Sequence, residues 1–378
     1  MSELPVWKEK VHVSVGTRVI LRLDLNLPKG STAAMKKSWR LQKALEEVRR
    51  LQKAKARTLI VAHLGDPAGK KVAELSLKSF APLLKSVLKT PVKFAEAYTG
   101  KKNTEIFESL EDGGVALAEN LRFFSGEEKN DDRFASQLAS GAEVYINNAF
   151  SVCHRKHASV FAITRHLPSF AGSLLIEEIE ALVKPLKHPF VLVVGGAKIA
   201  TKLPLLERLG PTADKIIIGG GPATSMLTAT KVTLPAYPKA FITDDALRSA
   251  GRIYRRFYKK IVLPIDLVAD PDKQIIFDHG PLSIKAFTAA LKGAKTVIWN
   301  GPFGIIEKKQ GEAATRAFAQ ALAKQKGLQV LVGGGETVDA ILDAGVEKKM
   351  THLSTGGGAM LAFLAGDPLP GLVALDQG

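Results

Sequence analysis

The sequence predicts an α/β fold with two doubly wound parallel-sheet lobes of the Rossmann-like type, joined by a hinge helix. Three observations predict this class. Apolar strand-like runs alternate with amphipathic helical stretches nearly throughout the chain. Three glycine-rich turns in the second half each sit between an apolar run and a helical stretch. The length of 378 residues, with 46% hydrophobic residues, suffices for two cores of ordinary size.

Apolar runs bounded by turn signals are predicted to be strands. In the first half they cover residues 19–27, 58–62, 91–94, 114–118 and 144–147, and in the second half residues 189–194, 215–219, 260–263, 296–299 and 329–332. A stretch rich in Leu, Ile and Glu over 172–184 predicts a helix that ends before Pro185. We therefore expect a first lobe over 1–171, a linking helix over 172–186 and a second lobe over 187–365.

The first predicted strand carries polar residues in a regular pattern. Its leucines at positions 21, 23, 25 and 27 alternate with Arg22, Asp24 and Asn26, and Pro28 then ends the strand. With a period of two, the leucines face the core and the polar side chains share the opposite face. Both faces of a parallel strand are normally apolar. The pattern therefore indicates a binding face at the carboxyl end of the strand, with a solvated edge strand as the alternative.

The three glycine-rich turns cover residues 193–198, 330–337 and 353–359. Glycine lets the backbone approach a ligand closely, and the free N–H groups at the start of the following helix favour an anion. The first turn also leads into Lys198 and Lys202, whose spacing of four residues predicts one shared helix face. The set indicates a polyphosphate site, and the alternative is three ordinary strand-to-helix turns.

Composition excludes several classes of partner. The formal net charge is +16, but the basic excess is spread over both halves without a concentrated stripe, so we expect no nucleic-acid partner. No apolar run reaches the length of a membrane span, and the N-terminus does not resemble a signal peptide. The single cysteine, Cys153, fits a reducing cytoplasm. No Cys/His cluster has zinc spacing, which favours a hard cation held by carboxylates and phosphates.

Further charged groups follow the predicted strands of the first half. His63 and Asp66 lie after the second strand, Arg122 after the fourth and Arg155 after the fifth, while Arg40 begins a helix that runs to about residue 53. The planar fork of arginine suits a bidentate grip on phosphate or carboxylate. The shared position of these groups after strand ends favours an anion-binding role over an ordinary surface role.

Taken together, the motifs resemble those of phosphoglycerate kinases over essentially the whole chain. They read RLDLNLP at 22–28, HLG at 63–65, ENLRF at 119–123 with GEE at 126–128, HRKHAS at 154–159, GGAK at 195–198, WNGPFG at 299–304, GGG at 333–335 and STGGG at 354–358. The resemblance implies a kinase that moves a phosphoryl group reversibly between ATP and the carboxylate of 3-phosphoglycerate, with ADP and 1,3-bisphosphoglycerate on the other side and Mg²⁺ as cofactor.

The resemblance also has implications for the architecture. The first lobe would hold the glycerate and the second lobe the Mg-nucleotide. A tail over 366–378 would pack back on the first lobe. The family is usually monomeric, so we expect a cytoplasmic monomer that has small-molecule substrates and neither a nucleic-acid nor a membrane partner.

The family pattern assigns residues of this chain to each ligand. 3-Phosphoglycerate would contact Arg22, Asp24, Asn26, Arg40, His63, Arg122 and Arg155. The transferring phosphoryl group would lie near Arg40, Lys198, Gly356 and Gly357. The nucleotide would contact Gly195, Ala197, Lys198, Lys202, Gly219, Gly220, Asn300, Pro302, Glu307, Gly334, Gly335, Glu336 and Thr337, and Glu336 would reach the metal.

The chain departs from the family pattern at several positions. Asp66 stands where a phosphate-binding arginine is usual, which predicts a reduced glycerate affinity unless Lys70 or Lys71 takes its place. Glu336 replaces the usual aspartate and adds one methylene at the metal. The other departures are Asn148 and Ser151, in place of Asp and Gly, and Pro222 and Thr224 after the 219–221 turn.

Two alternatives remain beside an active kinase. One is a catalytically weakened or moonlighting homologue that mainly binds nucleotide, which the changes at Asp66 and Glu336 suggest. The other is a nicotinamide-dependent dehydrogenase. No single turn gives the full G-x-G-x-x-G spacing with an acidic residue about 20 positions later, which disfavours the dehydrogenase.

Overall fold

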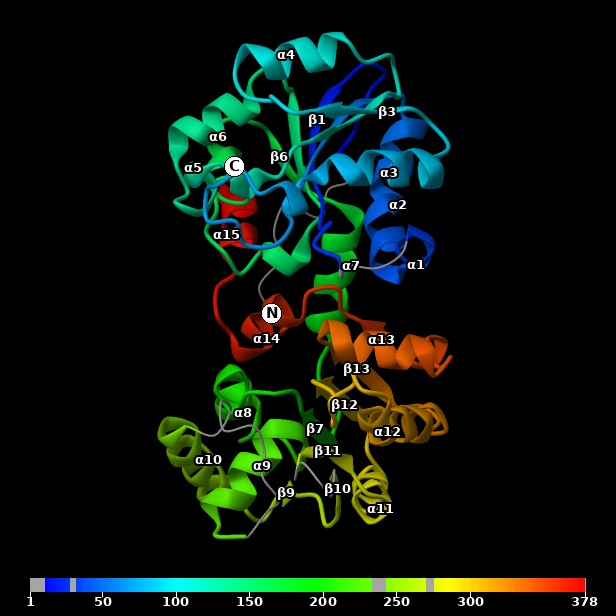
Figure 1. Cartoon of the computed structure of the whole chain (residues 1–378), viewed down its shortest axis with the longest axis vertical. Coiled ribbons are helices and arrows are strands. Elements are labelled where there is room, and N and C mark those ends of the chain that lie inside the picture. Colours follow the sequence, from blue (N-terminus) through cyan, green and yellow to red (C-terminus); the bar gives the residue numbers. More distant parts are fainter. Residues whose placement is uncertain (1–10, 28–31, 233–242, 270–274, 378) are drawn as a thin grey trace. The chain divides into compact units, whose positions relative to one another are not determined.

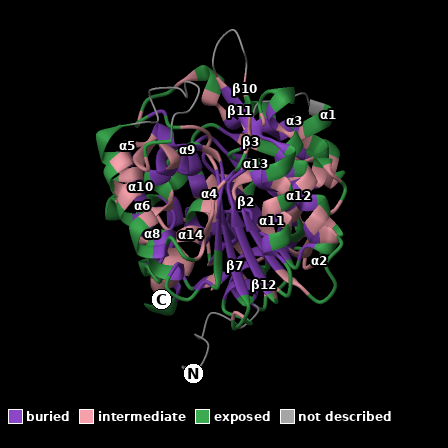
Figure 2. Cartoon of the chain, turned by 90° about the horizontal axis from the view of Figure 1, so that it is seen from below, coloured by how far each residue is buried: buried purple, intermediate pink, exposed green. Residues whose placement is uncertain are grey.

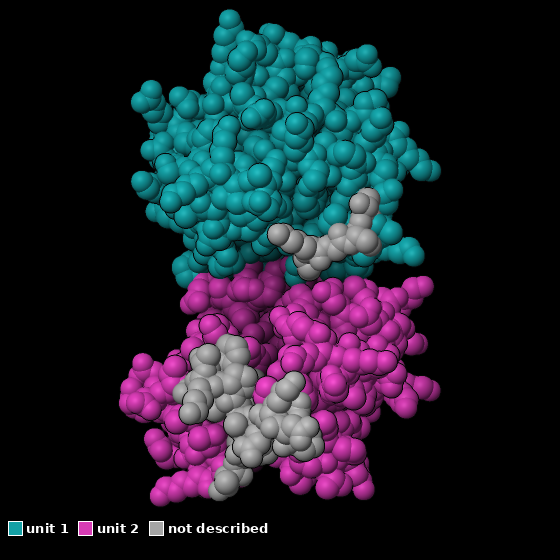
Figure 3. All heavy atoms as spheres, viewed as in Figure 1, with its two compact units in different colours: residues 1–179, 368–378 teal, residues 180–367 magenta. Residues whose placement is uncertain are grey.

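The computed structural model describes residues 11–27, 32–232, 243–269 and 275–377 (Figure 1). The chain divides into two compact units (Figure 3). Unit 1 consists of Met1–Ile179 with Pro368–Gly378, and unit 2 consists of Glu180–Asp367. The chain therefore passes twice between the units, once within helix α7 (Ser173–Leu182) and once just before helix α15 (Pro370–Gln377).

Unit 1 is built on a six-stranded parallel sheet in the order β3-β4-β2-β1-β5-β6. Its strands are β1 (Arg18–Arg22), β2 (Arg57–Val61), β3 (Val92–Ala95), β4 (Val115–Ala118), β5 (Val144–Asn147) and β6 (Ser169–Ala171). Its helices include α1 (Thr32–Lys37), α2 (Trp39–Lys53), α3 (Phe80–Leu88), α4 (Lys101–Glu108), α5 (Ser125–Glu128) and α6 (Asp132–Ala139).

Helices cover both faces of this sheet because successive strand residues point to opposite sides. Val19 and Leu21 of β1 pack in one apolar cluster with residues of α2 and α3. Ile20 packs in a second cluster with residues of α4 and α6. Figure 2 shows the buried residues concentrated on the strands and the exposed ones on the surrounding helices. This two-sided burial explains why the strands read as nearly continuous apolar runs.

Unit 2 repeats the architecture with the strand order β14-β13-β12-β7-β8-β9, all parallel. The strands are β7 (Phe190–Val194), β8 (Lys215–Ile218), β9 (Ile261–Val262), β12 (Thr296–Asn300), β13 (Gln329–Gly333) and β14 (His352–Leu353), with an antiparallel pair β10 (Leu267–Ala269) and β11 (Ile276–His279). The helices are α8 (Leu203–Leu209), α9 (Gly220–Ala229), α10 (Asp244–Phe257), α11 (Pro281–Ala290), α12 (Ala313–Ala323), α13 (Gly335–Asp343) and α14 (Gly357–Ala365).

The predicted fold class is confirmed, and one strand is corrected. The first strand ends at Arg22 instead of continuing to residue 27. Leu23 still donates its N–H to Val61, but the Asn26 N–H then turns to the side chain of Asp24, and the Leu27 N–H bonds Leu25. These local bonds replace the sheet ladder. The alternation of burial nevertheless continues, since Leu23 and Leu25 are buried while Asp24 and Asn26 face outward.

A second correction concerns the two lysines after β7. Lys198 has an extended backbone and caps the short 3₁₀ helix η7 (Ile199–Lys202), whereas Lys202 is its last residue. The predicted shared face of one helix is therefore wrong, because only one of the two lysines is helical. Within the described residues, no single helix is both long and apolar enough to span a bilayer, although α14 and α15 reach that length and composition as a bent pair.

Candidate functional site

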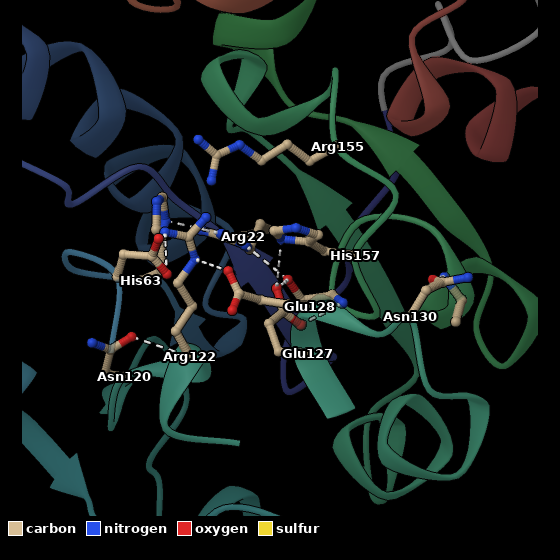
Figure 4. A network of polar contacts seen from close by, with 12 residues as sticks. Arg22, His63, Asn120, Arg122, Glu127, Glu128, Asn130, Arg155 and His157 are labelled. Atoms are coloured by element: carbon tan, nitrogen blue, oxygen red, sulfur yellow. Dashed lines mark hydrogen bonds and ion pairs between the residues drawn. The ribbon is translucent and has the colours of Figure 1, made fainter. Parts of the chain in front are cut away.

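In unit 1, arginine and histidine side chains gather where four parallel strands end. Arg22 ends β1, His63 follows β2, Arg122 lies in the 3₁₀ turn η4 (Leu121–Phe123) after β4, and His157 lies in the loop after β5. The carboxyl ends of parallel strands meet at one edge of a sheet, which brings these residues together. We call these four residues the basic cluster, and Figure 4 shows them side by side.

Arg22 has all three guanidinium nitrogens engaged with protein. Its Nε donates to Ser159 Oγ at 3.1 Å, Nη1 donates to the Leu23 carbonyl, and Nη2 lies 3.2 Å from His63 Nδ1. Only 1% of the residue is exposed. Ser159 in turn donates its hydroxyl and its N–H to the two oxygens of Glu127, at 2.6 and 2.9 Å. Arg22 and Glu127 are therefore opposite charges bridged by one hydroxyl inside the unit.

The histidines of the cluster are held neutral. Burial, followed by the charges of Arg22 and Arg122, lowers the pKa of His63 well below its ordinary value. The same causes, in the order burial, Arg122 and Arg22, lower the pKa of His157 to about 4. A neutral His63 accepts the Arg22 hydrogen bond at Nδ1, so its proton resides on Nε2. The positive charge of the cluster thus comes from the arginines alone.

Arg122 is faced by two carboxylates. Its Nη1 donates to the Gly65 carbonyl at 2.7 Å, and its guanidinium pairs with Glu128 at 3.3 Å and with Asp66 at 3.9 Å. The Asp66 side chain is 75% exposed. Lys71, one of the two lysines that could take the place of the usual arginine, pairs with Glu96 at 3.7 Å on the exposed surface. The unusual aspartate therefore sits directly beside the arginine expected to grip a phosphate.

The other predicted glycerate residues of the same unit lie on loops, except Arg40, which lies in the first turn of α2. Asp24 accepts the Asn26 N–H at 2.9 Å and the Ser151 hydroxyl at 2.6 Å, and Asn26 Oδ1 accepts the Gly65 N–H at 3.0 Å. Arg40 is the second residue of α2 and is partly exposed. Its Nε is buried with no hydrogen-bond partner in the described part of the chain.

Arg155 lies in the loop after β5 and is partly exposed. Its Nε donates to His154 Nε2 at 3.3 Å. In Figure 4 no dashed line joins its guanidinium to the labelled members of the basic cluster. An arginine carries five N–H donors, of which this bond uses one.

In unit 2, a cavity of about 160 Å³ lies among the strand ends and the glycine turns. Five residues predicted to bind nucleotide line it, namely Ala197, Gly220, Pro302, Glu307 and Glu336. Lining residues that the sequence interpretation did not assign to the nucleotide are Gly196, Thr224, Ile276, Phe277, Asp278, His279, Phe303, Gly304 and Ile305. The wall is thus mainly apolar, with acidic groups at 278, 307 and 336, as in many small-molecule pockets.

The glycine turns of this unit pack against one another through their backbones. The N–H of Gly195 bonds the Asn300 carbonyl at 2.9 Å, and the N–H of Gly196 bonds the Pro302 carbonyl at 2.7 Å. A Cβ on Gly221 would lie 1.8 Å from the Ala197 carbonyl oxygen. Gly219 caps α9, a role that Gly334 has at α13 and Gly356 at α14. The glycines therefore permit close contact between turns as well as approach to a ligand.

Asn300 lies where two of these helices begin. It is 1% exposed, its Oδ1 accepts from Lys202 Nζ, and its Nδ2 has no hydrogen-bond partner among the described residues. That Nδ2 lies 3.1, 3.6 and 3.8 Å from the positions that Cβ atoms on Gly333, Gly334 and Gly357 would take. A buried amide donor beside the first turns of α13 and α14 favours an anion.

Two ionisable groups near Asn300 have shifted pKa values. Burial lowers the pKa of Lys202 to about 8, against an opposing effect of Glu336. Burial, followed by the charge of Glu307, raises the pKa of Glu336, while Lys202 lowers it.

The remaining predicted nucleotide residues lie at the starts of α13 and η7. Gly335 begins α13, and Thr337, two residues later, accepts the Gly301 N–H at 3.1 Å. Lys198 is exposed at the start of η7.

His279 and Asp278 form a part of the cavity wall that sequence reasoning missed. His279 Nε2 accepts the Gly220 N–H at 2.9 Å, and burial lowers its pKa to about 4. Asp278 accepts the N–H groups of Ala314 and His279 at 2.8 and 2.9 Å, and burial raises its pKa to about 6. The sequence does contain the pattern of a strand end followed by a helix start. An apolar pair precedes Asp278 and His279, and Gly280 and a first-turn proline follow them.

Residues 10–367 match the family model described as phosphoglycerate kinase. The chain belongs to the phosphoglycerate kinase family. It is 38% identical to the phosphoglycerate kinase of Granulibacter bethesdensis over 95% of this chain and 96% of that protein. It is also 38% identical to the cytosolic phosphoglycerate kinase of Triticum aestivum, over 96% of each chain.

Solved structures of phosphoglycerate kinases agree with this assignment. The structure from Coxiella burnetii matches with a TM-score of 0.77 at 32% identity, over 97% of both chains. The structure from Pyrococcus horikoshii OT3 matches with a TM-score of 0.85 at 28% identity, over 95% of this chain and 96% of that chain. The family, and with it the class of phosphotransferases that act on a carboxyl group, is therefore shown for this chain by its sequence and its fold.

Proposed function

We propose that this chain is an active phosphoglycerate kinase that interconverts 1,3-bisphosphoglycerate and ADP with 3-phosphoglycerate and ATP, in glycolysis and gluconeogenesis. The observation that supports this most strongly is the pairing of two anion-favouring sites in one chain of the family. Unit 1 offers arginines at its strand ends, and unit 2 offers glycine turns at helix N-termini. Each fits one of the two anionic substrates.

In unit 1, we assign the 3-phosphate end of the glycerate to Arg122, Arg155 and His63. Asp24 and Asn26 would hold its hydroxyl and carboxylate ends. Arg22 differs from these residues, because its three guanidinium nitrogens already bond Ser159, Leu23 and His63. We therefore assign Arg22 to positioning: it fixes His63 in the tautomer that carries a proton on Nε2, which can donate to a phosphate oxygen.

In unit 2, the nucleotide would occupy the cavity of about 160 Å³. Its lining supports an apolar seat for the base, with Glu307 for the ribose hydroxyls. Lys202 would contact the nucleotide phosphates. The transferring phosphoryl group would lie near Lys198 and Arg40 and near the start of α14, which the chain enters through the predicted catalytic residues Gly356 and Gly357. Transfer requires that the ligands of the two units be brought together.

The residues of unit 2 fit a magnesium ion that is carried mainly by phosphates. Within the described residues, no group of three or more His, Cys, Asp or Glu side chains could hold a metal by itself. Mg²⁺ commonly binds through one or two carboxylates together with substrate phosphates and water. Glu336, which lines the cavity, would supply the carboxylate. When bound, the ion would neutralise charge on the phosphates.

The chemistry needs positioning and charge neutralisation more than proton transfer. The acceptor is a carboxylate, which is already ionised at neutral pH, so no general base is required. The neutral histidines of unit 1 agree with this, because burial and arginine charge hold their pKa values low. Arginines, lysines and oriented backbone N–H groups would stabilise the charge on the phosphoryl group in flight.

A coupled assay tests the proposal directly. Purified chain is mixed with Mg-ATP and 3-phosphoglycerate, and formation of 1,3-bisphosphoglycerate is followed through a coupling dehydrogenase. Turnover that requires both substrates and is lost in Lys198→Ala is the expected result. Binding of Mg-ADP without any turnover would instead support the homologue that mainly binds nucleotide, and binding of NAD alone would support the dehydrogenase.

We also propose a monomer in the cytoplasm. Relatives from Triticum aestivum and Arabidopsis thaliana are named as cytosolic, which supports the location. The monomer rests on the usual state of the family. Sedimentation equilibrium at several protein concentrations, giving a constant mass near 40.6 kDa, is the expected result.

A further inference from the structure

Ser151 is a residue of unit 1 whose side chain reaches the glycerate site from a separate loop. It lies in the 3₁₀ turn η5 (Phe150–Val152), which follows β5. Its hydroxyl donates to Asp24 Oδ2 at 2.6 Å, across a sequence separation of 127 residues. This is the short distance expected when a hydroxyl donates to an ionised carboxylate. The bond therefore joins the loop after β5 to the segment that follows β1.

The turn that carries Ser151 is firmly seated. Its neighbours Phe150 and Val152 are 0% and 3% exposed. Within the loop, the Ala149 N–H bonds Asn147 Oδ1 at 3.1 Å, and the Cys153 N–H bonds the Phe150 carbonyl at 3.0 Å. Because the backbone of the turn is held in place, the hydroxyl that it carries can hold a hydrogen-bond partner in place.

The two oxygens of Asp24 are held by different donors. Oδ1 accepts the Asn26 N–H at 2.9 Å, and Oδ2 accepts the Ser151 hydroxyl at 2.6 Å. Each carboxylate oxygen has a second lone pair, so both can still accept from a ligand hydroxyl. With only the Asn26 bond, the carboxylate could rotate about its terminal torsion, which is broad. The Ser151 bond removes that freedom.

We infer that Ser151 is a positioning residue for the glycerate, acting through Asp24. The inference rests on the proposed function, in which Asp24 binds the glycerate. Ordering a site before its ligand arrives reduces the free energy that binding must supply. Ser151 stands where the family pattern usually has glycine, which carries no side chain to make this bond.

Removal of the hydroxyl tests the inference. In Ser151→Ala, we expect the KM for 3-phosphoglycerate to rise about fivefold, because Asp24 is no longer held, while kcat and the KM for ATP stay within about twofold. Ser151→Thr keeps a hydroxyl and should restore the wild-type KM. Ser140→Ala is the matched control, since Ser140 Oγ donates to the Ser136 carbonyl on the exposed surface at 3.3 Å.

A double variant shows whether the effect passes through Asp24. In an Asp24→Ala background, Ser151→Ala should leave the KM for 3-phosphoglycerate unchanged. An added rise of the same size as in the wild type would overturn the inference. An unaltered KM for 3-phosphoglycerate in Ser151→Ala would also overturn it. So would a loss of kcat with equal changes in the KM values of both substrates, which a merely structural role predicts.

The proposed function can fail separately. If the wild-type chain shows no turnover, calorimetric titration of the same variants with 3-phosphoglycerate decides the inference: an affinity about fivefold weaker in Ser151→Ala supports it, and an unchanged affinity overturns it. Absence of 3-phosphoglycerate binding to the wild-type chain would overturn both.

Discussion

The two units have the same sheet architecture but form their sites from different parts of the chain. In unit 1 the site consists of long charged side chains whose partners are one another, as in the chain of contacts from His63 through Arg22 and Ser159 to Glu127. In unit 2 the site consists of backbone turns in direct contact, with a buried amide at Asn300.

The difference determines how each site responds to change. A site made of side-chain charges changes its affinity when one charge changes, since every member lies in the field of the others. A site made of backbone turns tolerates many side-chain changes but not an added Cβ at a contact point, because interiors are close-packed. The two units should therefore separate charge substitutions from glycine substitutions.

The largest effect is expected at Lys198. Lys198→Ala should reduce kcat about a thousandfold with a smaller change in nucleotide affinity, because the proposed role of the ammonium is to neutralise charge that develops during transfer. Lys202→Ala should also weaken nucleotide binding. Initial-rate kinetics at saturating substrates provide the measurement, with the exposed Lys292→Ala as control. A near-normal kcat in Lys198→Ala would remove Lys198 from the catalytic set.

The next largest effect is expected from one methyl group in unit 2. In Gly357→Ala the new Cβ would lie 2.8 Å from the Cα and N atoms of Gly334, so the first turns of α13 and α14 must move apart. A displacement of about 1 Å at a reacting centre can cost about a hundredfold, and we expect a loss of this order in kcat/KM for ATP.

Gly251→Ala is the matched control for that variant. It adds the same methyl group on α10, where the contacts at 3.6 and 3.7 Å are ordinary ones. The control should keep full activity and gain slightly in stability, because alanine favours a helix. Full activity in Gly357→Ala as well would show that the turns of unit 2 can adjust, contrary to the comparison.

Much of the fold was predictable from the sequence because burial on both sheet faces leaves apolar runs. The strand predicted at 144–147 is β5 itself. The errors have physical causes. The leucines after Arg22 stay buried beyond the end of β1. Their apolar pattern therefore does not indicate where the hydrogen bonds between strands end. The two-residue β14 is too short to give a pattern.

The candidate site was less predictable than the fold. Residue types and their place after strands could be identified, and Arg22, His63 and Arg122 do lie together. Their pairing partners could not be identified, because the bond between Ser151 and Asp24 joins residues 127 positions apart. Burial has no local signature either. The sequence therefore predicts Arg22 as a ligand contact without showing that its three guanidinium nitrogens bond protein groups.

A moderate effect is expected at Asp66, where a charge can be changed without altering the fold. Its carboxylate lies 3.9 Å from Arg122 Nη1 and competes with any phosphate there. Asp66→Arg should lower the KM for 3-phosphoglycerate about tenfold, because an arginine can bind the phosphate, and should leave the KM for ATP nearly unchanged. The effect stays moderate because the position is exposed, which weakens the ionic interaction. Asp66→Asn removes the charge without adding a cation and should give an intermediate value. A KM that stays the same or rises in both variants would show that this loop does not contact the phosphate.

The smallest effect concerns the pH dependence of the stability of unit 1. Burial and then the charges of Arg122 and Arg22 lower the pKa of His157 to about 4, whereas Asp66 acts in the opposite direction. In the unfolded chain a histidine has a pKa of about 6.5. Between these values the unfolded chain binds a proton that the folded chain does not. Stability is therefore independent of this group above about pH 7 and falls as the pH drops from about 6.5 to 4.

Urea unfolding of the wild-type chain and of His157→Asn, at about pH 7.5 and about pH 5, measures this contribution. The wild type should lose on the order of 1 kcal/mol more than the variant between the two pH values, because the variant has no proton to bind at this position. Equal losses in the two chains would mean that neither burial nor the arginine charges lower the pKa of His157 in the folded chain.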